Sequence, residues 1–190
     1  MNRLDLFKDK KILITGHTGF KGSWLTIWLK NLGGKILGIS LRPQTIPSNY
    51  YDCEISKNIK TVFINIQNKK KLEKILNSFK PDFVFHLAAQ SIVLKSFNEP
   101  MNTWNTNLIG TMNLLESLKK LTKKCAVVLV TSDKCYKNVG SKKGYKETDR
   151  LGGDDPYSAS KASCEILINS YINSFFNKKR NKITICSVRA

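Results

Sequence analysis

Short apolar runs alternate along the chain with longer segments in which apolar residues recur every three or four positions. The runs are too continuous for strands of a sheet with one wet face, so they are typical of parallel strands covered on both faces. We expect strands at Ile12–Ile14, Lys35–Leu41, Thr61–Ile66, Asp82–Leu87, Ala126–Val130 and Ile183–Val188. Helices are expected at Ser23–Leu32, Lys69–Phe79, Asn102–Lys120 and Pro156–Phe176. This alternation predicts a doubly wound α/β domain.

Polar segments separate these elements. Residues 42–58 contain prolines and few apolar positions, and residues 137–155 are rich in Gly and Lys, so both are expected to be loops. Asn68 directly precedes the helix expected at Lys69–Phe79 and suits its N-cap.

Three glycines, Gly16, Gly19 and Gly22, lie between the first strand and the first helix. A glycine loop that leads from a strand into a helix can hold a pyrophosphate against the backbone N–H groups of the helix N-terminus. We expect Gly16 to form the tight turn, Gly19 to let the backbone approach phosphate, and Gly22 to let the helix pack closely on the strand. The spacing departs from the usual Gly-x-Gly-x-x-Gly, so a purely structural turn remains the alternative.

Polar or small residues lie at the carboxyl ends of four of the expected strands. They are the glycine loop, Asn65, Ala88-Ala89 and Ser132-Asp133-Lys134. Ligands of open parallel sheets bind in the crevice beyond the carboxyl ends of the strands. The sequence therefore predicts a site at this edge of a Rossmann-type sheet.

Tyr157 and Lys161 are four residues apart at the start of the last helix and so share one face. An ammonium beside a phenol favours the phenolate, which could take a proton from a sugar hydroxyl. Ser132 could donate a hydrogen bond to the same hydroxyl oxygen. Asp133 and Lys134 place an acid and a base beside it, although a turn with a solvated ion pair would explain them equally well.

Five segments together resemble the extended short-chain dehydrogenase/reductase family of NAD-dependent epimerases and dehydratases. They are Gly16–Leu25, His86–Gln90, Asn107–Thr111, Thr131–Tyr136 and Asp155–Lys161. The first and fourth are most similar to the CDP-glucose 4,6-dehydratases of that family, and the resemblance extends from Lys11 to Ala190.

The resemblance implies a hydro-lyase reaction on a nucleotide sugar, CDP-glucose, with one bound NAD. Tyr157, assisted by Lys161 and Ser132, would deprotonate the 4-hydroxyl as a hydride leaves C4. Water would then be eliminated across C5 and C6, and the hydride would return to C6. Asp133 would protonate the departing 6-hydroxyl, and Lys134 would occupy the position of the base, which requires a neutral amine.

The resemblance also implies which residues contact the dinucleotide. They are Gly16, Thr18, Gly19, Phe20, Gly22, Arg42, Asn65, Ile66, Leu87, Ala88, Ala89, Tyr157 and Lys161. An acidic residue is expected about 20 residues after the glycines to hold the ribose of NAD, but Leu41-Arg42 stand there. An arginine suits a 2′-phosphate, so NAD is favoured by resemblance and NADP is left open.

Composition bears on nucleic-acid binding, metal binding and location in the cell. The formal net charge is +18, but the lysines lie in short runs along the chain, including Lys178–Arg180, and a solvated surface explains them better than a nucleic-acid face. Five scattered cysteines and two histidines predict free thiols and no metal site. No apolar run could span a membrane and no apolar signal segment is present, so we expect a cytoplasmic protein.

The chain is shorter than members of the family, whose C-terminal region supplies much of the sugar-nucleotide site. We therefore expect residues 1–190 to form the NAD(P)-binding Rossmann domain without that region, to bind dinucleotide weakly and to turn over CDP-glucose poorly or not at all. The alternatives are another sugar-nucleotide epimerase or dehydratase, or a non-catalytic dinucleotide-binding remnant. Helices 102–120 and 156–176 resemble the faces of a homodimer contact, although packing on the sheet would explain their apolar stripes equally well.

Overall fold

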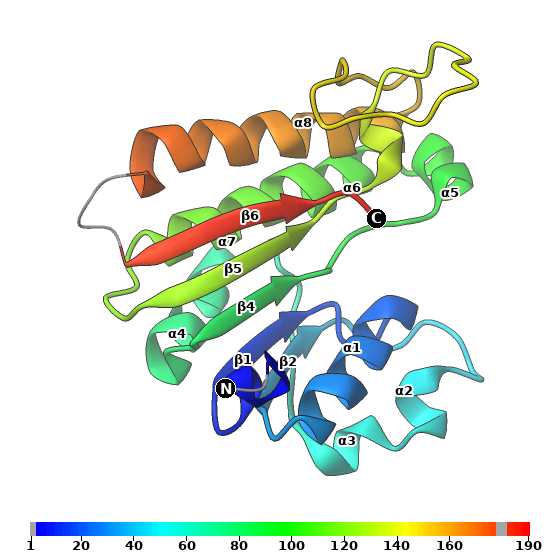
Figure 1. The fold of residues 1–190 in the computed structure, drawn as a ribbon. Coiled ribbons are helices and arrows are strands. Elements are labelled where there is room, and N and C mark those ends of the chain that lie inside the picture. The colour runs from blue at the N-terminus through cyan, green and yellow to red at the C-terminus, as the bar shows by residue number, and fades with distance from the viewer. Residues whose placement is uncertain (1–2, 178–181) are drawn as a thin grey trace.

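A six-stranded, fully parallel sheet forms the centre of the protein in the computed structural model, which describes residues 3–177 and 182–190 (Figure 1). The strand order is β3-β2-β1-β4-β5-β6, the doubly wound order of the Rossmann fold, as expected. The strands are β1 (Lys11–Thr15), β2 (Lys35–Ser40), β3 (Lys60–Phe63), β4 (Phe83–His86), β5 (Cys125–Val130) and β6 (Ile183–Val188). The register pairs Thr15 with His86 and Val130 with Val188, so the carboxyl ends of these strands meet at one edge.

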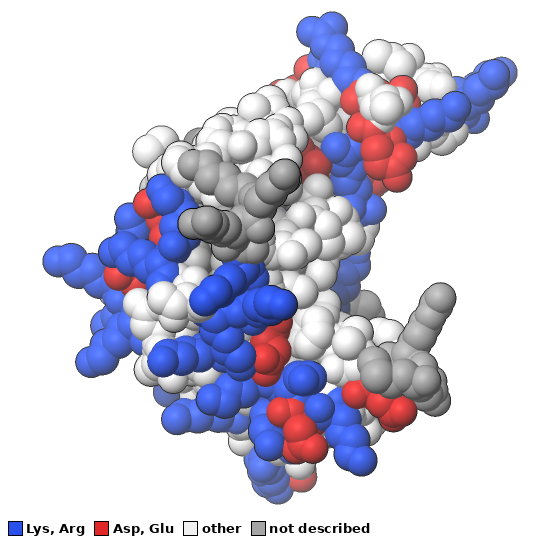
Figure 2. Space-filling view, turned by 60° about the vertical axis from the view of Figure 1, so that its left-hand side comes forward, with Lys and Arg blue, Asp and Glu red and all other residues white. Residues whose placement is uncertain are grey.

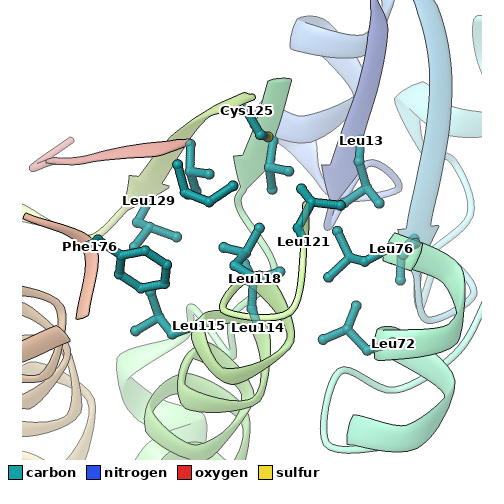
Figure 3. Packing of buried hydrophobic residues seen from close by; sticks show 14 of the residues in the cluster. Leu13, Leu72, Leu76, Leu114, Leu115, Leu118, Leu121, Cys125, Leu129 and Phe176 are labelled. Atoms are coloured by element: carbon teal, nitrogen blue, oxygen red, sulfur yellow. The ribbon is translucent and has the colours of Figure 1, made fainter. Parts of the chain in front are cut away.

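Helices cover the two faces of the sheet. They are α1 (Phe20–Asn31), α2 (Asn49–Asp52), α3 (Ile55–Asn58), α4 (Lys69–Phe79), α5 (Val93–Asn98), α6 (Pro100–Trp104), α7 (Gly110–Leu118) and α8 (Pro156–Tyr171). The larger apolar cluster lies between the sheet and α4, α7 and α8, where Leu72, Leu115 and Ile168 are buried (Figure 3). A second cluster joins β1 and β2 to α1 through Ile12, Ile14 and Leu29.

Strand β1 shows why the apolar runs are continuous. Leu13 is completely buried in the larger cluster, whereas Ile12 and Ile14 are completely buried in the second cluster on the opposite face. Successive side chains of a strand point to opposite faces, so a strand with helices on both sides has to be apolar at every position.

Several boundaries differ from expectation. Residues 42–58, expected to be a loop, contain the two four-residue helices α2 and α3, which are too short to give a helical periodicity. Strand β3 ends at Phe63, three residues early, and α5 was not expected. The two long helices hold their expected positions but each contains a π-helical turn, η2 (Asn105–Ile109) before α7 and η4 (Ile172–Phe176) after α8.

Other elements lie where the sequence placed them. Helix α4 and strand β6 have their expected bounds, and the Asn68 side chain accepts a hydrogen bond from the Lys71 N–H at 3.1 Å, which confirms the N-cap. A short 3-10 helix, η1 (Arg3–Phe7), precedes β1.

On the face of the molecule shown in Figure 2, Lys and Arg side chains lie in several groups, with Asp and Glu side chains among them. Lys120 pairs with Glu73 at 2.7 Å and Lys123 with Asp82 at 2.6 Å, so part of the positive charge is neutralised locally. The run Lys178–Arg180 lies outside the described residues.

Candidate active site

A cavity of about 820 Å³ opens at the carboxyl ends of the strands, where the sequence predicted a crevice. The segments that follow β1, β2, β3, β4 and β5 all contribute to its lining, together with the first two turns of α8. Each of the thirteen residues expected to contact a dinucleotide lines this cavity. Its volume is typical of a pocket that encloses a small-molecule ligand.

The glycine loop turns sharply out of β1. Gly16 has a φ of +76°, and a Cβ there would lie 2.7 Å from the backbone nitrogen of Ala88. A Cβ on Gly22 would lie 2.1 Å from the carbonyl oxygen of Gly16. Turn geometry therefore requires glycine at position 16, as predicted. Glycine is required at position 22 by close packing of α1 on the loop, whereas packing on the strand was expected.

Gly19 differs from the other two glycines. Its φ is −77°, and the nearest atom to a Cβ there would be the Gly16 carbonyl oxygen at 3.4 Å, which is an ordinary contact. The protein's own packing therefore does not require glycine at this position. The reason that remains is the one proposed from the sequence, namely close approach of a ligand to the backbone.

Helix α1 presents its first turn to the cavity. Gly19 is the N-cap and makes no side-chain capping bond, and the next three residues, Phe20, Lys21 and Gly22, all line the cavity. The first N–H groups of a helix have no partner within the helix and carry its positive dipole end, so this turn can bind an anion.

A buried chain of hydrogen bonds joins β1 to β4 and α7. Thr15 Oγ1 lies 2.7 Å from His86 Nδ1, and His86 Nε2 lies 3.1 Å from Thr111 Oγ1. The Thr111 hydroxyl donates to the carbonyl oxygen of Asn107, so we assign the His86 proton to Nε2. Burial, with a smaller contribution from the Lys161 charge, lowers the pKa of His86 to about 3.

Asn107 extends this network to α8. Its Oδ1 accepts from the Gln90 N–H at 2.8 Å, and its Nδ2 donates to the Gln90 carbonyl at 3.1 Å and to Ser160 Oγ at 2.9 Å. The Ser160 hydroxyl donates to the carbonyl oxygen of Tyr157 at 2.7 Å. One buried amide thereby fixes the segment after β4 relative to the first turn of α8.

The N-cap residue Asp155 and Ser96 of α5 also fix the start of α8 through hydrogen bonds. Asp155 is the N-cap and accepts from the Ser158 N–H at 2.9 Å and from the Ser158 hydroxyl. Burial acts to raise the pKa of Asp155, but these hydrogen bonds outweigh it and lower the pKa below its usual value. The Tyr157 N–H donates to Ser96 Oγ of α5 at 3.2 Å.

Tyr157 and Lys161 both line the cavity and are both buried. The Lys161 ammonium donates to the Val130 carbonyl oxygen at the end of β5, at 3.4 Å. Burial is the main cause that lowers the pKa of Lys161, since it removes the ammonium from water. Tyr157, Lys161 and the glycine loop therefore line the same cavity.

Ser132, Asp133 and Lys134 follow β5 but are not among the residues that line the cavity, whereas their neighbour Thr131 is. Ser132 is buried, donates to Asp133 Oδ1 at 3.0 Å and accepts from the Lys134 N–H, so it caps the short 3-10 helix η3 (Asp133–Cys135). The side chains of Asp133 and Lys134 are 68% and 58% exposed and lie 3.6 Å apart. They do not have the buried surroundings that a lysine base needs.

A buried ion pair behind the cavity was not expected from the sequence. Glu165, one turn after Lys161 on α8, accepts hydrogen bonds from Thr131, Ser187 and Arg189. Arg189 also donates to the Tyr136 hydroxyl at 2.8 Å and lies over its ring. The pair joins α8, the ends of β5 and β6, and the segment that contains Ser132. The position of Glu165, four residues after Lys161, places both residues on one face of the helix but does not indicate Arg189 as the partner.

The charges around the cavity fit an anionic ligand. Lys21, Arg42, Lys95 and Lys161 line it, and no Asp or Glu does so among the described residues. The free N–H groups of α1, the open position at Gly19 and these cations together suit the pyrophosphate of a dinucleotide.

Within residues 3–177 and 182–190 no group of His, Cys, Asp and Glu side chains could hold a metal ion. The same part of the chain contains no helix that is long and apolar enough to cross a membrane. All five cysteines are free thiols.

Comparisons with known proteins agree with this arrangement. Residues 13–187 match the sequence profile of the family described as GDP-mannose 4,6 dehydratase. The chain is 40% identical over 189 residues to CDP-glucose 4,6-dehydratase of Salmonella typhimurium, which covers 98% of this chain and 53% of that protein. It is 35% identical to dTDP-D-glucose 4,6-dehydratase of Dictyostelium discoideum, over 92% of this chain and 43% of that protein. The chain thus spans about half the length of these relatives.

Among solved structures, UDP-glucose 4-epimerase of Thermus thermophilus in complex with NAD matches with a TM-score of 0.79 and 25% identity. That match covers 94% of this chain and 54% of the epimerase. The architecture of the sheet and the glycine loop is therefore that of sugar-nucleotide dehydratases and epimerases.

Proposed function

Because the chain belongs to the GDP-mannose 4,6 dehydratase family, we propose that residues 1–190 are the NAD-binding and catalytic part of a sugar-nucleotide 4,6-dehydratase, a hydro-lyase. The proposed substrate is CDP-glucose and the product is CDP-4-dehydro-6-deoxyglucose, with loss of one water. One observation carries the proposal: Tyr157 and Lys161 line the same cavity as the glycine loop.

The residues of the cavity fit a dinucleotide. The pyrophosphate would lie over the first turn of α1, and the nicotinamide end would lie toward Tyr157 and Lys161. The chemistry that bound NAD supplies is reversible hydride transfer, from C4 of the sugar at the start and to C6 at the end, so the reaction has no net redox change.

Tyr157 would take the proton of the sugar 4-hydroxyl. Lys161 follows Tyr157 by about one turn of α8, so its ammonium would stabilise negative charge on the phenol oxygen, and its bond to the Val130 carbonyl fixes its position at the end of β5. Ser132 would donate to the same sugar oxygen. This requires its hydroxyl to turn away from Asp133, to which it donates in the structure.

The 4-ketone acidifies the proton on C5, and elimination of water then needs an acid and a base. We propose Asp133 as the acid that protonates the departing 6-hydroxyl and Lys134 as the base. Both side chains are exposed here, so burial by the substrate would have to supply the dry surroundings in which an amine is neutral.

We propose CDP-glucose, and not another nucleotide sugar, because 40% identity to the Salmonella enzyme extends over 98% of this chain. The match to UDP-glucose 4-epimerase supports NAD as the cofactor. The alternative, that this protein is an epimerase, is less favoured because an epimerase needs no acid and base after Ser132.

The test is to incubate the protein with NAD and CDP-glucose and to detect the dehydrated sugar nucleotide by mass spectrometry, with dTDP-glucose and GDP-mannose as controls. Because relatives are about twice as long, the chain is tested alone and with the C-terminal remainder of the Salmonella enzyme joined after Ala190. Product from CDP-glucose that disappears in Tyr157→Phe supports the proposal. If neither form gives product although both bind NAD, the dehydratase assignment is wrong.

A further inference from the structure

The outer face of α1 carries three exposed aromatic residues in line. Phe20 is 74% exposed, and Trp24 and Trp28 are each 56% exposed. Successive members of the set are four residues apart, so they lie on one side of the helix. We call Phe20, Trp24 and Trp28 the aromatic stripe.

The opposite side of α1 packs on the protein's own core. Leu29 is buried in the second apolar cluster, and Leu25 packs against that cluster. Helix α1 is therefore apolar on two sides, and such a helix is normally buried on both. A single apolar residue on a surface needs no explanation, but three aromatic rings along one helix indicate a contact surface.

The size of the aromatic stripe fits the centre of an interface between two copies of the chain. An aromatic side chain presents about 150–250 Å², so at these exposures the three rings leave about 300–450 Å² of apolar surface open to water. Two copies would together cover about 600–900 Å². A standard interface buries about 1,600 Å² in total, of which a little more than half is apolar. Two stripes would thus supply most of that apolar area.

The charges beside the stripe favour self-association over an anionic partner. Lys21 and Lys30 lie on α1. Asp52 and Glu54 lie on α2 and at the start of α3, and both of these helices contact α1. A net charge of +18 would favour a nucleic acid or an anionic membrane on a face that is only basic, but this face carries both signs. A two-fold contact sets the same patch of each copy face to face, so cations of one copy can pair with acids of the other.

We propose that a second copy of the chain docks on the aromatic stripe, with the α1 helices of the two copies face to face about a two-fold axis. Trp24 and Trp28 form the centre of the contact, where aromatic residues contribute most to the binding energy. Phe20 also lines the cavity, so the cavity of each copy opens beside the interface. This surface is distinct from helices 102–120 and 156–176, whose faces resemble a homodimer contact.

The experiment is sedimentation velocity of the chain over a range of protein concentrations. We expect Trp24→Glu/Trp28→Glu to halve the molar mass of the assembled chain, because a carboxylate in the centre of the contact would lose its water. Added salt should strengthen the assembly of the unaltered chain, since it screens the repulsion between two copies of charge +18. Binding to an anionic partner would instead weaken with salt.

Val139→Glu is the matched control, because Val139 is an exposed apolar residue in the loop of residues 137–155, at the end of the molecule opposite α1 (Figure 1). It should leave the molar mass unchanged. If it lowers the mass as much as the double tryptophan variant does, any added negative charge suffices and the inference is wrong.

A second measurement leaves the stripe unaltered and so does not depend on how the double variant folds. The chain has three tryptophans, and Trp104→Phe leaves only the two of the stripe. Their fluorescence should become less accessible to acrylamide as the chain assembles.

Three results would overturn the inference. The first is a chain that stays monomeric at about 100 µM, which means a dissociation constant weaker than that concentration. The second is assembly with no change in quenching, which places the contact elsewhere. The third is protection of both tryptophans in a monomeric fusion with the C-terminal remainder of the Salmonella enzyme, which would show that this remainder covers the stripe.

Discussion

The carboxylate of Glu165 lies 2.8 Å from the guanidinium of Arg189, and the two side chains are 5% and 18% exposed. One belongs to α8, one turn after Lys161, and the other follows β6. Because Glu165 also accepts from Thr131 and Ser187, the pair connects the neighbouring strands β5 and β6 to the helix that carries the proposed catalytic phenol.

Removal of one partner of this pair should be costly. Arg189→Met leaves a buried carboxylate without its cation, and we expect the free energy of unfolding to fall by about 3 kcal/mol. The double variant Glu165→Met/Arg189→Met should lose less than the sum of the single variants, because it leaves neither charge unpaired. Urea denaturation of the four proteins measures this coupling, and strictly additive losses would contradict it.

Substitutions of Gly19 and Gly22 should separate the role of the loop in packing from its role in ligand binding. Gly22→Ala places a Cβ 2.1 Å from the Gly16 carbonyl, so we expect it to lower both stability and NAD affinity. Gly19→Ala meets only an ordinary 3.4 Å contact and should keep its stability while NAD binding weakens about 10-fold. Thermal unfolding and calorimetric titration give the two readouts.

Gly144→Ala is the control for both variants, since a Cβ there has no atom within 4 Å. It should change neither stability nor NAD affinity. Full NAD affinity in Gly19→Ala would show that the loop does not bring its backbone close to phosphate.

Two histidines should make stability depend on pH. Burial lowers the pKa of His86 to about 3 and is the main cause that lowers the pKa of His17 to about 4, from an unfolded value of 6.5. The unfolded chain therefore binds more protons between pH 6.5 and 4, and stability falls as the pH is lowered through that range. At pH 5 each histidine should cost about 2 kcal/mol relative to pH 7.

Denaturation curves between pH 7 and pH 5 measure this loss. His86→Gln lowers stability at pH 7 but should reduce its pH dependence by roughly half, since only His17 then titrates in that range. An unchanged slope would mean that His86 is not a neutral, buried group.

The side chain of Asn107 should make a large contribution to stability, because one amide makes three buried hydrogen bonds. Asn107→Ala removes partners from the Gln90 backbone and from Ser160, so we expect a loss of about 2–3 kcal/mol. Asn169→Ala, on the exposed side of α8, should change stability by less than about 0.5 kcal/mol. Equal effects of the two substitutions in urea denaturation would argue against a structural role for the buried network.

Local patterns in the sequence were sufficient to predict the sheet and the edge at which the cavity lies, and the family resemblance supplied thirteen of the residues that line it, but Ser132, Asp133 and Lys134 do not line it. Apolar runs place the strands, and Gly16 and Gly22 are dictated by turn geometry and close packing. Arg42 could likewise be placed by counting from the glycines.

Other features depend on contacts between distant segments and leave no local signal. Helices α2 and α3 are four residues long, so no periodicity reveals them. Glu165 becomes an ion-pair partner only because β6 brings Arg189 beside α8, and Ser96 becomes a support for α8 only through a helix, α5, that was not expected. The exposure of Asp133 and Lys134 is likewise a property of the folded surface.

The most direct test of the central claim, that one cavity joins the glycine loop to Tyr157 and Lys161, is an NMR titration of the labelled protein with NAD. We expect the amide signals of residues 16–22 and 157–161 to shift together with one dissociation constant. Signals of residues 119–125, at the opposite ends of the strands, should not move. Shifts confined to those lysine-rich residues, or to only one of the two cavity segments, would contradict a dinucleotide bound between the glycine loop and the catalytic pair.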